Sequence, residues 1–410
     1  MTVEYTLQDP LNFPKVPLKQ LDSESAPATW IEPGTSNRKF LRRAPFAHFD
    51  PDGAAIFADL SYMEIPYPPV YATSIADATL VGFRTLLKGD HFLMDEVISA
   101  PAAAARHVER LDSPDEHRNE RTGLRRMAGS NIFQLDERQE APIHIEQPVI
   151  LLSSDEPENY GSFLFRVLPK LAFSRLLARK FKLLVSVPHE SMSRLLEICG
   201  VDLSSVIVHN TKKVYRLDRV IAPSVRNPHA FLDEVTIGLF NEIRTRIAPD
   251  NANKRDLIFV SRRNLGSTKA GYRAMENEAE IRLCLEQLGF RTICPETMSA
   301  DEQIKTFASA AVVVGQSGGA MFNVAFCRPG TIVIDIESEP HWIHAHMSYF
   351  SSLNLRYVIF EGKPIPREDR NIHLPFRVNA GVLTALLEDI LASDLQLARR
   401  GAPVLAMTGS

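Results

Sequence analysis

Cysteine pairs that would build a zinc site or a disulfide framework are missing from this 410-residue chain. None of its four cysteines belongs to a C-x-x-C pair, and each lies in apolar sequence. Isolated cysteines of this kind are typical of small core residues in a reducing compartment. The four are Cys199, Cys284, Cys294 and Cys327. We therefore expect no structural metal and no disulfide.

Long apolar runs and an excess of one charge are missing as well. No window approaches the roughly 18 apolar residues that a membrane-spanning helix needs. The first ten residues carry acidic groups and no apolar run, unlike a secretory leader. A total of 46 basic and 50 acidic residues gives a net charge of −4, which disfavours a general nucleic-acid or membrane-surface binder. We expect a cytoplasmic protein that binds no nucleic acid and reaches the inner face of a membrane only through partners or weak surface contacts.

Apolar residues are plentiful, and their pattern predicts two α/β lobes. They make up 45% of the chain, and 410 residues exceed the usual size of one compact domain. From residue 147 onward, short apolar strands alternate with amphipathic helices, which predicts parallel sheets with helices on both faces. The proposed division is an irregular N-terminal arm over residues 1–50, an α/β lobe over 51–250, a second α/β lobe over 251–375, and a C-terminal helix and tail over 376–410. Two successive Rossmann-like lobes with an interdomain cleft are the two-lobed architecture of many nucleotide-sugar transferases.

A glycine-rich strand-to-helix turn is the most informative local pattern. The buried strand predicted at residues 312–314 is followed by Gly315, Gly318 and Gly319, and then by a sequence that suits a helix. Such a turn aims free N–H groups and the positive end of a helix dipole at the space above the strand, which suits a diphosphate. The alternative is a tight turn in an ordinary βαβ unit.

Two arginines follow another predicted strand. Arg262 and Arg263 come at the carboxyl end of the strand over residues 257–261, the edge that faces ligands in such sheets. A guanidinium there can bind phosphate oxygens in a bidentate way, and the alternative is a solvated surface pair. Lys269, in the loop that follows, is a weaker candidate.

Acidic residues at strand ends offer a catalytic base and a ribose ligand. Asp155, Glu156 and Glu158 occupy the corresponding loop of the first lobe, where one could accept a proton from an acceptor hydroxyl. Glu296 follows a strand of the second lobe and could hold a ribose, as could Asp335 or Glu337. For each of these residues, helix capping or a solvated loop is the alternative.

Three histidines form an H-x-x-H-x-H cluster at His341, His344 and His346. The first two share a helix face, but the third does not follow at the next turn. Partly buried or acceptor-contacting histidines are therefore favoured over a metal site.

Several stretches, taken in order, resemble glycosyltransferase family 61, a group once described as capsular polysaccharide biosynthesis proteins. The resemblance covers about residues 145–360. It rests on N-Y-G-S-F-L at 159–164 with L-P-K-L at 168–171, S-R-R at 261–263 with N-E at 277–278, L-G-F at 288–290 with P-E at 295–296, E-Q-I at 302–304, and G-Q-S-G-G-A-M-F-N at 315–323 with F-C-R-P-G at 326–330.

The resemblance implies a two-lobed, GT-B-like enzyme that uses nucleotide-activated sugars, usually with inversion and without an obligatory metal. Bacterial members are associated with surface polysaccharides. Carried over by motif, Arg262 or Arg263 and the turn over residues 315–323, with Ser317 inside it, would face the donor diphosphate. Glu296 and Asn323 would shape that pocket.

Two positions depart from the family, which often has a histidine where this chain has Ser162 and another where it has Ser317. A serine cannot act as a base near neutral pH without a partner, so another residue would have to supply one. The catalytic candidates are accordingly Asp155, Glu158 and Ser162.

The sequence therefore predicts an inverting, metal-independent glycosyltransferase that acts on a nucleotide sugar and a glycan acceptor and needs no other cofactor. The paired histidine departures keep a non-catalytic nucleotide-binding scaffold protein of a polysaccharide assembly complex as an alternative. A nucleotide-sugar epimerase on the same architecture is the third hypothesis.

Overall fold

The computed structural model describes residues 5–50, 63–96, 123–126, 133–135, 141–177, 181–249, 255–265, 273–369 and 372–399. The chain divides into two compact units. Unit 1 comprises Met1–Phe40, Glu64–Pro228 and Asp233–Leu239, and unit 2 comprises Leu41–Met63, His229–Leu232 and Phe240–Ser410. The chain last passes from unit 1 to unit 2 after Leu239, inside the helix α6 (Glu234–Ile247), whereas the sequence placed the boundary near residue 250.

The sheet of unit 1 has a parallel half that follows the predicted alternation. It contains β11 (Ile143–Ile145), β12 (Val149–Leu152), β13 (Lys182–Val185), β14 (Val206–Val208) and β15 (Tyr215–Pro223). All four side chains of β12 are buried, as expected of a central parallel strand. Strand β12 lies between β15 and β13, so the carboxyl ends of these three strands meet at one edge.

The other half of this sheet is antiparallel, which the sequence analysis did not predict. It consists of β2 (Ala28–Ile31), β6 (Tyr71–Val81), β7 (Thr85–Lys88) and β8 (His91–Leu93), with β1 (Thr6–Leu7) parallel to β8. The tight turn between β7 and β8 contains Gly89 with φ 61°, a conformation that glycine adopts without strain. In the sequence, the pair Gly89-Asp90 is the local pattern that indicates a hairpin here.

The first 50 residues differ from the expected irregular arm. Besides β1 and β2, they form η1 (Pro10–Asn12), η2 (Leu18–Gln20), β3 (Arg38–Arg42) and β4 (Ala47–Phe49). Strand β2 pairs with β6 in unit 1, and β4 pairs with β20 in unit 2. These short strands carry polar residues as well as apolar ones, so their hydrophobic pattern is weak, and sheet partners far along the chain specify them.

Short helices cover the parallel half of unit 1. They are α3 (Tyr160–Ser162), the π-helical turn η3 (Phe163–Val167), η4 (Leu168–Lys170), α4 (Leu171–Ser174), α5 (Glu190–Ile198), η5 (Leu203–Ser205) and η6 (Pro228–Ala230), the last continuing into unit 2. Three further short strands are β5 (Met63–Tyr67), β9 (Leu124–Arg126) and β10 (Phe133–Leu135). The helix α5 is followed closely by Gly200 with φ 86°, a residue and conformation typical of a helix end.

Unit 2 contains a wholly parallel six-stranded sheet in the order β17-β16-β18-β19-β20-β4. Its strands besides β4 are β16 (Asp256–Val260), β17 (Arg291–Ile293), β18 (Ala310–Gln316), β19 (Ile332–Glu337) and β20 (Arg356–Glu361). The chain runs from β16 outward to β17 and then returns to β18 on the opposite side of β16. The order therefore reverses between β16 and β18.

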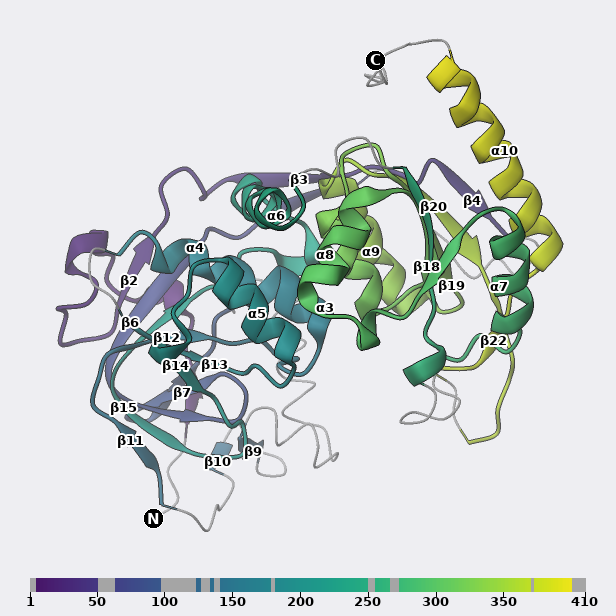
Figure 1. The fold of residues 1–410 in the computed structure, drawn as a ribbon. Coiled ribbons are helices and arrows are strands. Elements are labelled where there is room, and N and C mark those ends of the chain that lie inside the picture. Colours follow the sequence, from purple (N-terminus) through teal and green to yellow (C-terminus); the bar gives the residue numbers. More distant parts are fainter. Residues whose placement is uncertain are drawn as a thin grey trace. The chain divides into compact units, whose positions relative to one another are not determined.

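Helices pack on both faces of this sheet (Figure 1). The helices α8 (Ala300–Ser309) and α9 (Pro340–Ser352) lie on one face, and α7 (Glu278–Gln287) and α10 (Ala380–Arg399) lie on the other. The short elements are η8 (Arg263–Leu265), η9 (Pro295–Thr297), η10 (Gly319–Phe326), β21 (Lys363–Pro364) and β22 (Phe376–Arg377). Ser299 and Glu302 form a capping box at the start of α8.

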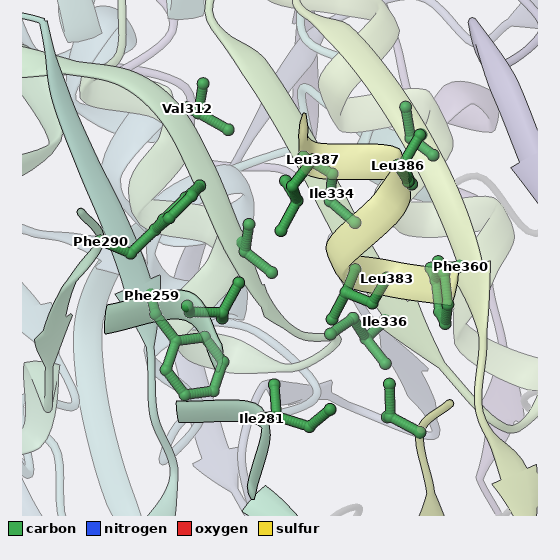
Figure 2. Close-up of a cluster of buried hydrophobic side chains, with 14 of the residues drawn as sticks. Phe259, Ile281, Phe290, Val312, Ile334, Ile336, Phe360, Leu383, Leu386 and Leu387 are labelled. Atoms are coloured by element: carbon green, nitrogen blue, oxygen red, sulfur yellow. The ribbon is translucent and has the colours of Figure 1, made fainter. Parts of the chain in front are cut away.

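The hydrophobic core under α10 makes this helix part of unit 2 instead of an appendage. Figure 2 shows Leu383 and Leu387 of α10 packed against Ile334 of β19 and Phe360 of β20. All four side chains are buried. Full burial of one such side chain contributes roughly 1.5–3 kcal/mol, so loss of α10 would expose a large part of this core.

A buried histidine gives unit 1 a predicted sensitivity to acid. His209 follows β14, is 3% exposed, and packs its ring edge against Tyr215 with centroids 5.4 Å apart. Its Nε2 atom has no hydrogen-bond partner among the described residues. Burial lowers the pKa of His209 from 6.5 to about 4, although a hydrogen bond with the backbone of Gly82 opposes the shift.

We expect the wild-type protein to lose stability relative to a His209→Phe variant as pH falls from 7 towards 4. The unfolded chain binds a proton at this position below pH 6.5, whereas the folded chain resists it until about pH 4. The full difference amounts to at most about 3 kcal/mol. Urea denaturation of both proteins at pH 7 and pH 5 measures it. An identical pH dependence of the two proteins would contradict the assignment.

Candidate functional site

The loops after β16 and β18 lie together at the carboxyl edge of unit 2. The two strands are direct neighbours, and Val260 pairs with Gly315 at their carboxyl ends. The connections from these strands leave in opposite directions because the strand order reverses here. In open α/β sheets, ligands bind in the crevice at such a reversal. The two motifs that the sequence singled out, residues 261–263 and 315–323, occupy these two loops.

The glycines of the second loop remove side chains where other groups must approach. A Cβ atom on Gly315 would lie 2.5 Å from the Met321 sulfur and 2.9 Å from Cβ of Val260, so only glycine fits between β16 and η10. A Cβ atom on Gly318 would lie 3.1 Å from Nη1 of Arg262. This nitrogen also lies 3.4 Å from the carbonyl oxygen of Ser317. The Arg262 guanidinium therefore lies directly against the glycine turn.

Free N–H groups are available where the turn enters η10, although this element is a 3₁₀ helix and not the expected α-helix. The first hydrogen bond of the turn runs from Met321 N to Gly318 O, at 3.0 Å. The N–H groups of Gly319 and Ala320 precede it, and both residues are partly exposed. Together with Arg262 they form a small cationic cradle. The Ser317 N–H does not contribute, because it donates to Ile336 O at 2.8 Å.

The Ser317 side chain lies beneath this cradle and is fully buried. Its hydroxyl donates to Oδ2 of Asp335 at 3.0 Å and lies 3.1 Å from Nδ1 of His346, which is itself 3.1 Å from the same carboxylate oxygen. The three side chains hold the residue that directly precedes Gly318. The Ser317 hydroxyl thus makes its contacts inside the protein, and the predicted contact with the donor is left to the backbone of the turn.

Asn323 is also fully buried and acts on the same turn from the other side. Its amide nitrogen donates to Oε1 of Gln303 at 2.9 Å and to the carbonyl oxygen of Ala320 at 3.2 Å. The side chain ties η10 to α8. The sequence predicted that Asn323 shapes the donor pocket, and its hydrogen bond to Ala320 is the contact through which it would do so.

A pocket of about 480 Å³ opens beside the cradle, along β17 and α8. Arg263 lines it and is exposed, in contrast to the partly buried Arg262. The lining carries three cations and one carboxylate among polar and apolar residues: Arg263, Asn264, Arg291, Thr292, Ile293, Cys294, Thr297, Met298, Glu302, Lys305 and Thr306. Glu296 lies in η9 next to Thr297 and is exposed. The predicted donor-side residues thus converge on one edge of unit 2. Lys269 lies outside the described residues.

The acceptor-side candidates lie at the carboxyl end of β12 in unit 1. Asp155 is buried and forms an ion pair with Arg166 of the π-helical turn. Ser162 is buried, and its hydroxyl donates to Oγ of Ser154 at 3.3 Å. Asn159 caps α3 by accepting the Ser162 N–H at 3.2 Å, whereas Glu158 is exposed. The N-Y-G-S motif therefore builds a capped turn at the strand end.

Comparison with protein families identifies the stretch that holds most of these residues. Residues 160–334 match the family model described as Glycosyltransferase 61. This stretch, less than half of the chain, is therefore similar to glycosyltransferase family 61. The match confirms the resemblance inferred from the motifs, and it spans the arginine pair, the glycine turn and the capped turn. No curated protein matches the chain.

The family 61 segment also places an exposed histidine that the sequence analysis overlooked. His189 precedes α5, in the loop after β13, and its Nε2 atom lies 3.2 Å from the carbonyl oxygen of Glu158. Strands β12 and β13 are parallel, with Leu152 opposite Val185, so their following loops share one edge. A histidine between a predicted strand and a predicted helix was the available signal.

A buried ion-pair network was equally unpredicted. Lys170, inside the family 61 segment, pairs with Asp95 and donates to the carbonyl oxygen of Ser153 at 2.8 Å. Arg84 donates to the same carboxylate at 2.7 Å, and the Asp95 carbonyl accepts the N–H of Val225 at 2.9 Å. Burial lowers the pKa of Lys170. Burial alone would raise the pKa of Asp95, but the charges of Lys170 and Arg84 outweigh it, so the pKa of Asp95 is lowered. The network therefore connects the segments that directly follow β12 and β15.

The histidines of the H-x-x-H-x-H cluster do not converge on one point. His344 contacts Arg42 at 2.7 Å, whereas His346 contacts Ser317 and Asp335. Throughout the described part of the chain, no group of three potential ligands is arranged to hold a metal. The side chain of His341 lies outside that part. The other ribose candidates, Asp335 and Glu337, are buried, and burial raises the pKa of Glu337 even though it pairs with Arg273.

Among the described residues, no helix is both long enough and apolar enough to cross a bilayer.

Proposed function

We propose that this protein is an inverting glycosyltransferase that moves a sugar from a nucleotide-sugar donor to a glycan acceptor. The observation that carries the proposal is the contact of Arg262 with the Gly318 turn, at the reversal point of the parallel sheet and inside the family 61 segment. A guanidinium and two free N–H groups at one point suit a diphosphate. The match to family 61 supports a glycosyl donor over other diphosphates.

The proposed donor spans the cradle and the adjoining pocket. The diphosphate binds Arg262 and the N–H groups of Gly319 and Ala320. The nucleoside enters the 480 Å³ pocket, where the apolar lining residues suit a nucleobase and Arg263 contributes a charge, with Glu296 near the ribose. Gly315, Ser317 and Asn323 act on this donor site by shaping and holding the turn.

The proposed chemistry is a single displacement. The acceptor hydroxyl attacks the anomeric carbon opposite the departing diphosphate, so the configuration inverts. Arg262 and the two N–H groups stabilise the charge that develops on the leaving group, and in this proposal no metal ion is required. Asp155, Glu158 and Ser162 stay predicted acceptor-side residues, to be tested individually.

The proposed architecture is two-lobed and GT-B-like, with the donor on unit 2 and the acceptor on unit 1. The acceptor class that family 61 suggests is a surface polysaccharide, such as a capsule. We accordingly propose action at the cytoplasmic face of a membrane, through peripheral association with polysaccharide machinery.

A non-catalytic nucleotide-binding scaffold is the second candidate. Two observations favour it: Asp155 is held by Arg166, and the Ser162 hydroxyl is buried against Ser154. A protein of this kind would bind nucleotide sugars without turning them over. The two candidates therefore agree on binding and differ on transfer.

A thermal-shift screen with nucleotides and nucleotide sugars, followed by a transfer assay with the best ligand, tests the proposal. A ligand at a hundred times its dissociation constant stabilises the folded protein by about 2.7 kcal/mol, which is readily detected. Binding that Arg262→Gln weakens, together with a glycosylated product, supports the transferase. Binding without any product supports the scaffold, and stabilisation by no nucleotide contradicts both.

A further inference from the structure

We propose that His346 takes up a proton when the donor binds, so that donor affinity falls as pH rises. The proposal rests on the proposed donor site and deepens it, because it names a positioning residue that regulates this site. The residues that carry it all belong to unit 2. They lie under residues 317–320 of the glycine-rich loop, here called the donor turn.

The His346 ring lies beneath the donor turn and contacts it directly. Its Nδ1 atom lies 3.1 Å from the Ser317 hydroxyl and 3.1 Å from Oδ2 of Asp335. Ser317 immediately precedes Gly318, which the free N–H groups of the turn follow. The three polar side chains are at most 3% exposed, so water screens their charges poorly. A proton gained or lost here therefore acts on whatever binds the turn.

The hydrogen bonds fix the state of one ring nitrogen. Ser317 has a single hydroxyl hydrogen, which it donates to Oδ2 of Asp335 at 3.0 Å. A bare Nδ1 would then face two acceptor oxygens at 3.1 Å, so Nδ1 must carry a hydrogen. The ring can therefore gain a proton only at Nε2, and this proton converts the ring from neutral to cationic.

The carboxylate of Asp335 gives that proton its effect on the donor. It is fully buried, and its Oδ1 atom has no hydrogen-bond partner among the described residues. When the His346 ring is neutral, no described cation pairs with Asp335, and the buried negative charge repels a diphosphate at the turn. When the ring is an imidazolium, the two charges compensate each other. A bound diphosphate therefore favours the protonated ring, and the protonated ring favours the diphosphate by the same factor.

The other charged side chains around the pair are engaged elsewhere. Those on the neighbouring strands and on α9 have partners of their own, namely Glu337 with Arg273, Glu361 with His48, and His344 with Arg42. Arg262 lies on the donor side, 3.4 Å from the Ser317 carbonyl oxygen, and η10 contains no charged residue. Burial raises the pKa of Glu337, Arg273 opposes this shift, and the Asp335 charge adds to it. Of the described residues, His346 is therefore the group that can neutralise Asp335.

Isothermal titration calorimetry in buffers of different ionisation enthalpy counts the protons that are taken up with the donor. The probe is the nucleotide sugar that stabilises the wild-type protein most in the thermal-shift screen. It lacks the terminal phosphate of a free nucleotide, which titrates at about pH 6 and would add protons of its own. At pH 7 we expect wild type to take up about half a proton per donor, which corresponds to a roughly threefold rise in Kd per pH unit.

His346→Asn and the matched control His344→Asn are titrated in the same way. Asparagine keeps an N–H donor near the position of Nδ1 but cannot become cationic. We expect His346→Asn to bind the donor without proton uptake and with the same Kd at pH 6 and pH 8. His344 lies two residues earlier on α9, is exposed and contacts Arg42, so its replacement should leave the uptake at the wild-type value.

Asp335→Asn separates an effect of charge from an effect of structure. Asparagine can accept both hydrogen bonds at the position of Oδ2, but it removes the negative charge. At pH 8, where the ring is neutral, we expect this variant to bind the donor more tightly than wild type does. A merely structural role of Asp335 would weaken binding instead.

The outcomes distinguish a failure of the proton linkage from a failure of the donor site. Donor binding without proton uptake by wild type, or with equal uptake by wild type and His346→Asn, would overturn the role of His346 alone. If His346→Asn does not fold, Asp335→Asn decides: weaker binding than wild type at pH 8 overturns that role, and tighter binding supports it. A wild-type protein that no nucleotide sugar stabilises would overturn the linkage together with the proposed function.

Discussion

Replacement of Arg262 by glutamine is expected to lower sugar-transfer turnover by roughly 10²–10³-fold, the usual cost of losing one preorganised donor to a developing charge. The guanidinium lies against Gly318, where a Cβ atom would be only 3.1 Å from Nη1, and Gly319 and Ala320 follow Gly318 in the same turn. Glutamine removes the charge while keeping a polar side chain of intermediate length. Steady-state kinetics with a saturating nucleotide sugar measures the loss in kcat.

The neighbouring arginine provides the matched control. Arg263 is exposed and lines the adjoining pocket, so Arg263→Gln should raise KM for the donor more than it lowers kcat. Arg262→Lys should fall between wild type and Arg262→Gln, because lysine keeps the charge but lacks the fork. Equal kcat values for the Arg262→Gln and Arg263→Gln variants would show that the cradle does not stabilise the leaving group.

Replacement of Lys170 by methionine is expected to destabilise unit 1 by about 3–5 kcal/mol, because breaking a buried ion pair leaves an uncompensated charge. Lys170 is 2% exposed, pairs with the buried Asp95 and also donates to the Ser153 carbonyl. Arg84 would still contact the carboxylate, but Glu96 shares that arginine. Urea denaturation followed by fluorescence and by circular dichroism gives the change in midpoint.

Lys182→Met is the control for this measurement. Lys182 belongs to β13 of the same unit and donates to the Ser204 carbonyl at 2.8 Å near the surface. Its loss should cost less than about 1 kcal/mol. If Lys170→Met costs no more than Lys182→Met, then the ion-pair network is not what stabilises the edge between β12 and β15.

The strand-and-turn pattern of unit 2 could be predicted from its sequence. β-Branched runs before Arg262 and before Gly315 marked β16 and β18, and glycines marked the turn. The capping box of α8 and the glycine after α7, Gly289 with φ 88°, were also visible as local signals. The arginine pair and the glycine turn came together as expected, because neighbouring parallel strands bring their carboxyl ends to one edge.

The roles of individual side chains in this site could not be predicted. The sequence treated Arg262 and Arg263 alike, although one lies in the cradle and the other lines the pocket. It assigned Ser317 to the donor-facing turn without a role for the side chain, and only the structure shows that its hydroxyl donates to Asp335 and lies beside His346. Adjacent residues at a strand end point in different directions, and only packing decides which one is buried.

The sequence by itself determined the α/β class, the turn chemistry and the similarity of residues 160–334 to family 61, because these depend on residue types at short, fixed spacings. The tertiary structure alone decided the antiparallel half of unit 1, the pairing of Lys170 with Asp95 and the contact of His189 with Glu158. The two side-chain pairs lie 75 and 31 residues apart in the chain, and the strands β6 and β15 are still further apart. Such contacts arise from burial and strand register, which depend on the whole fold and leave no mark in local spacing.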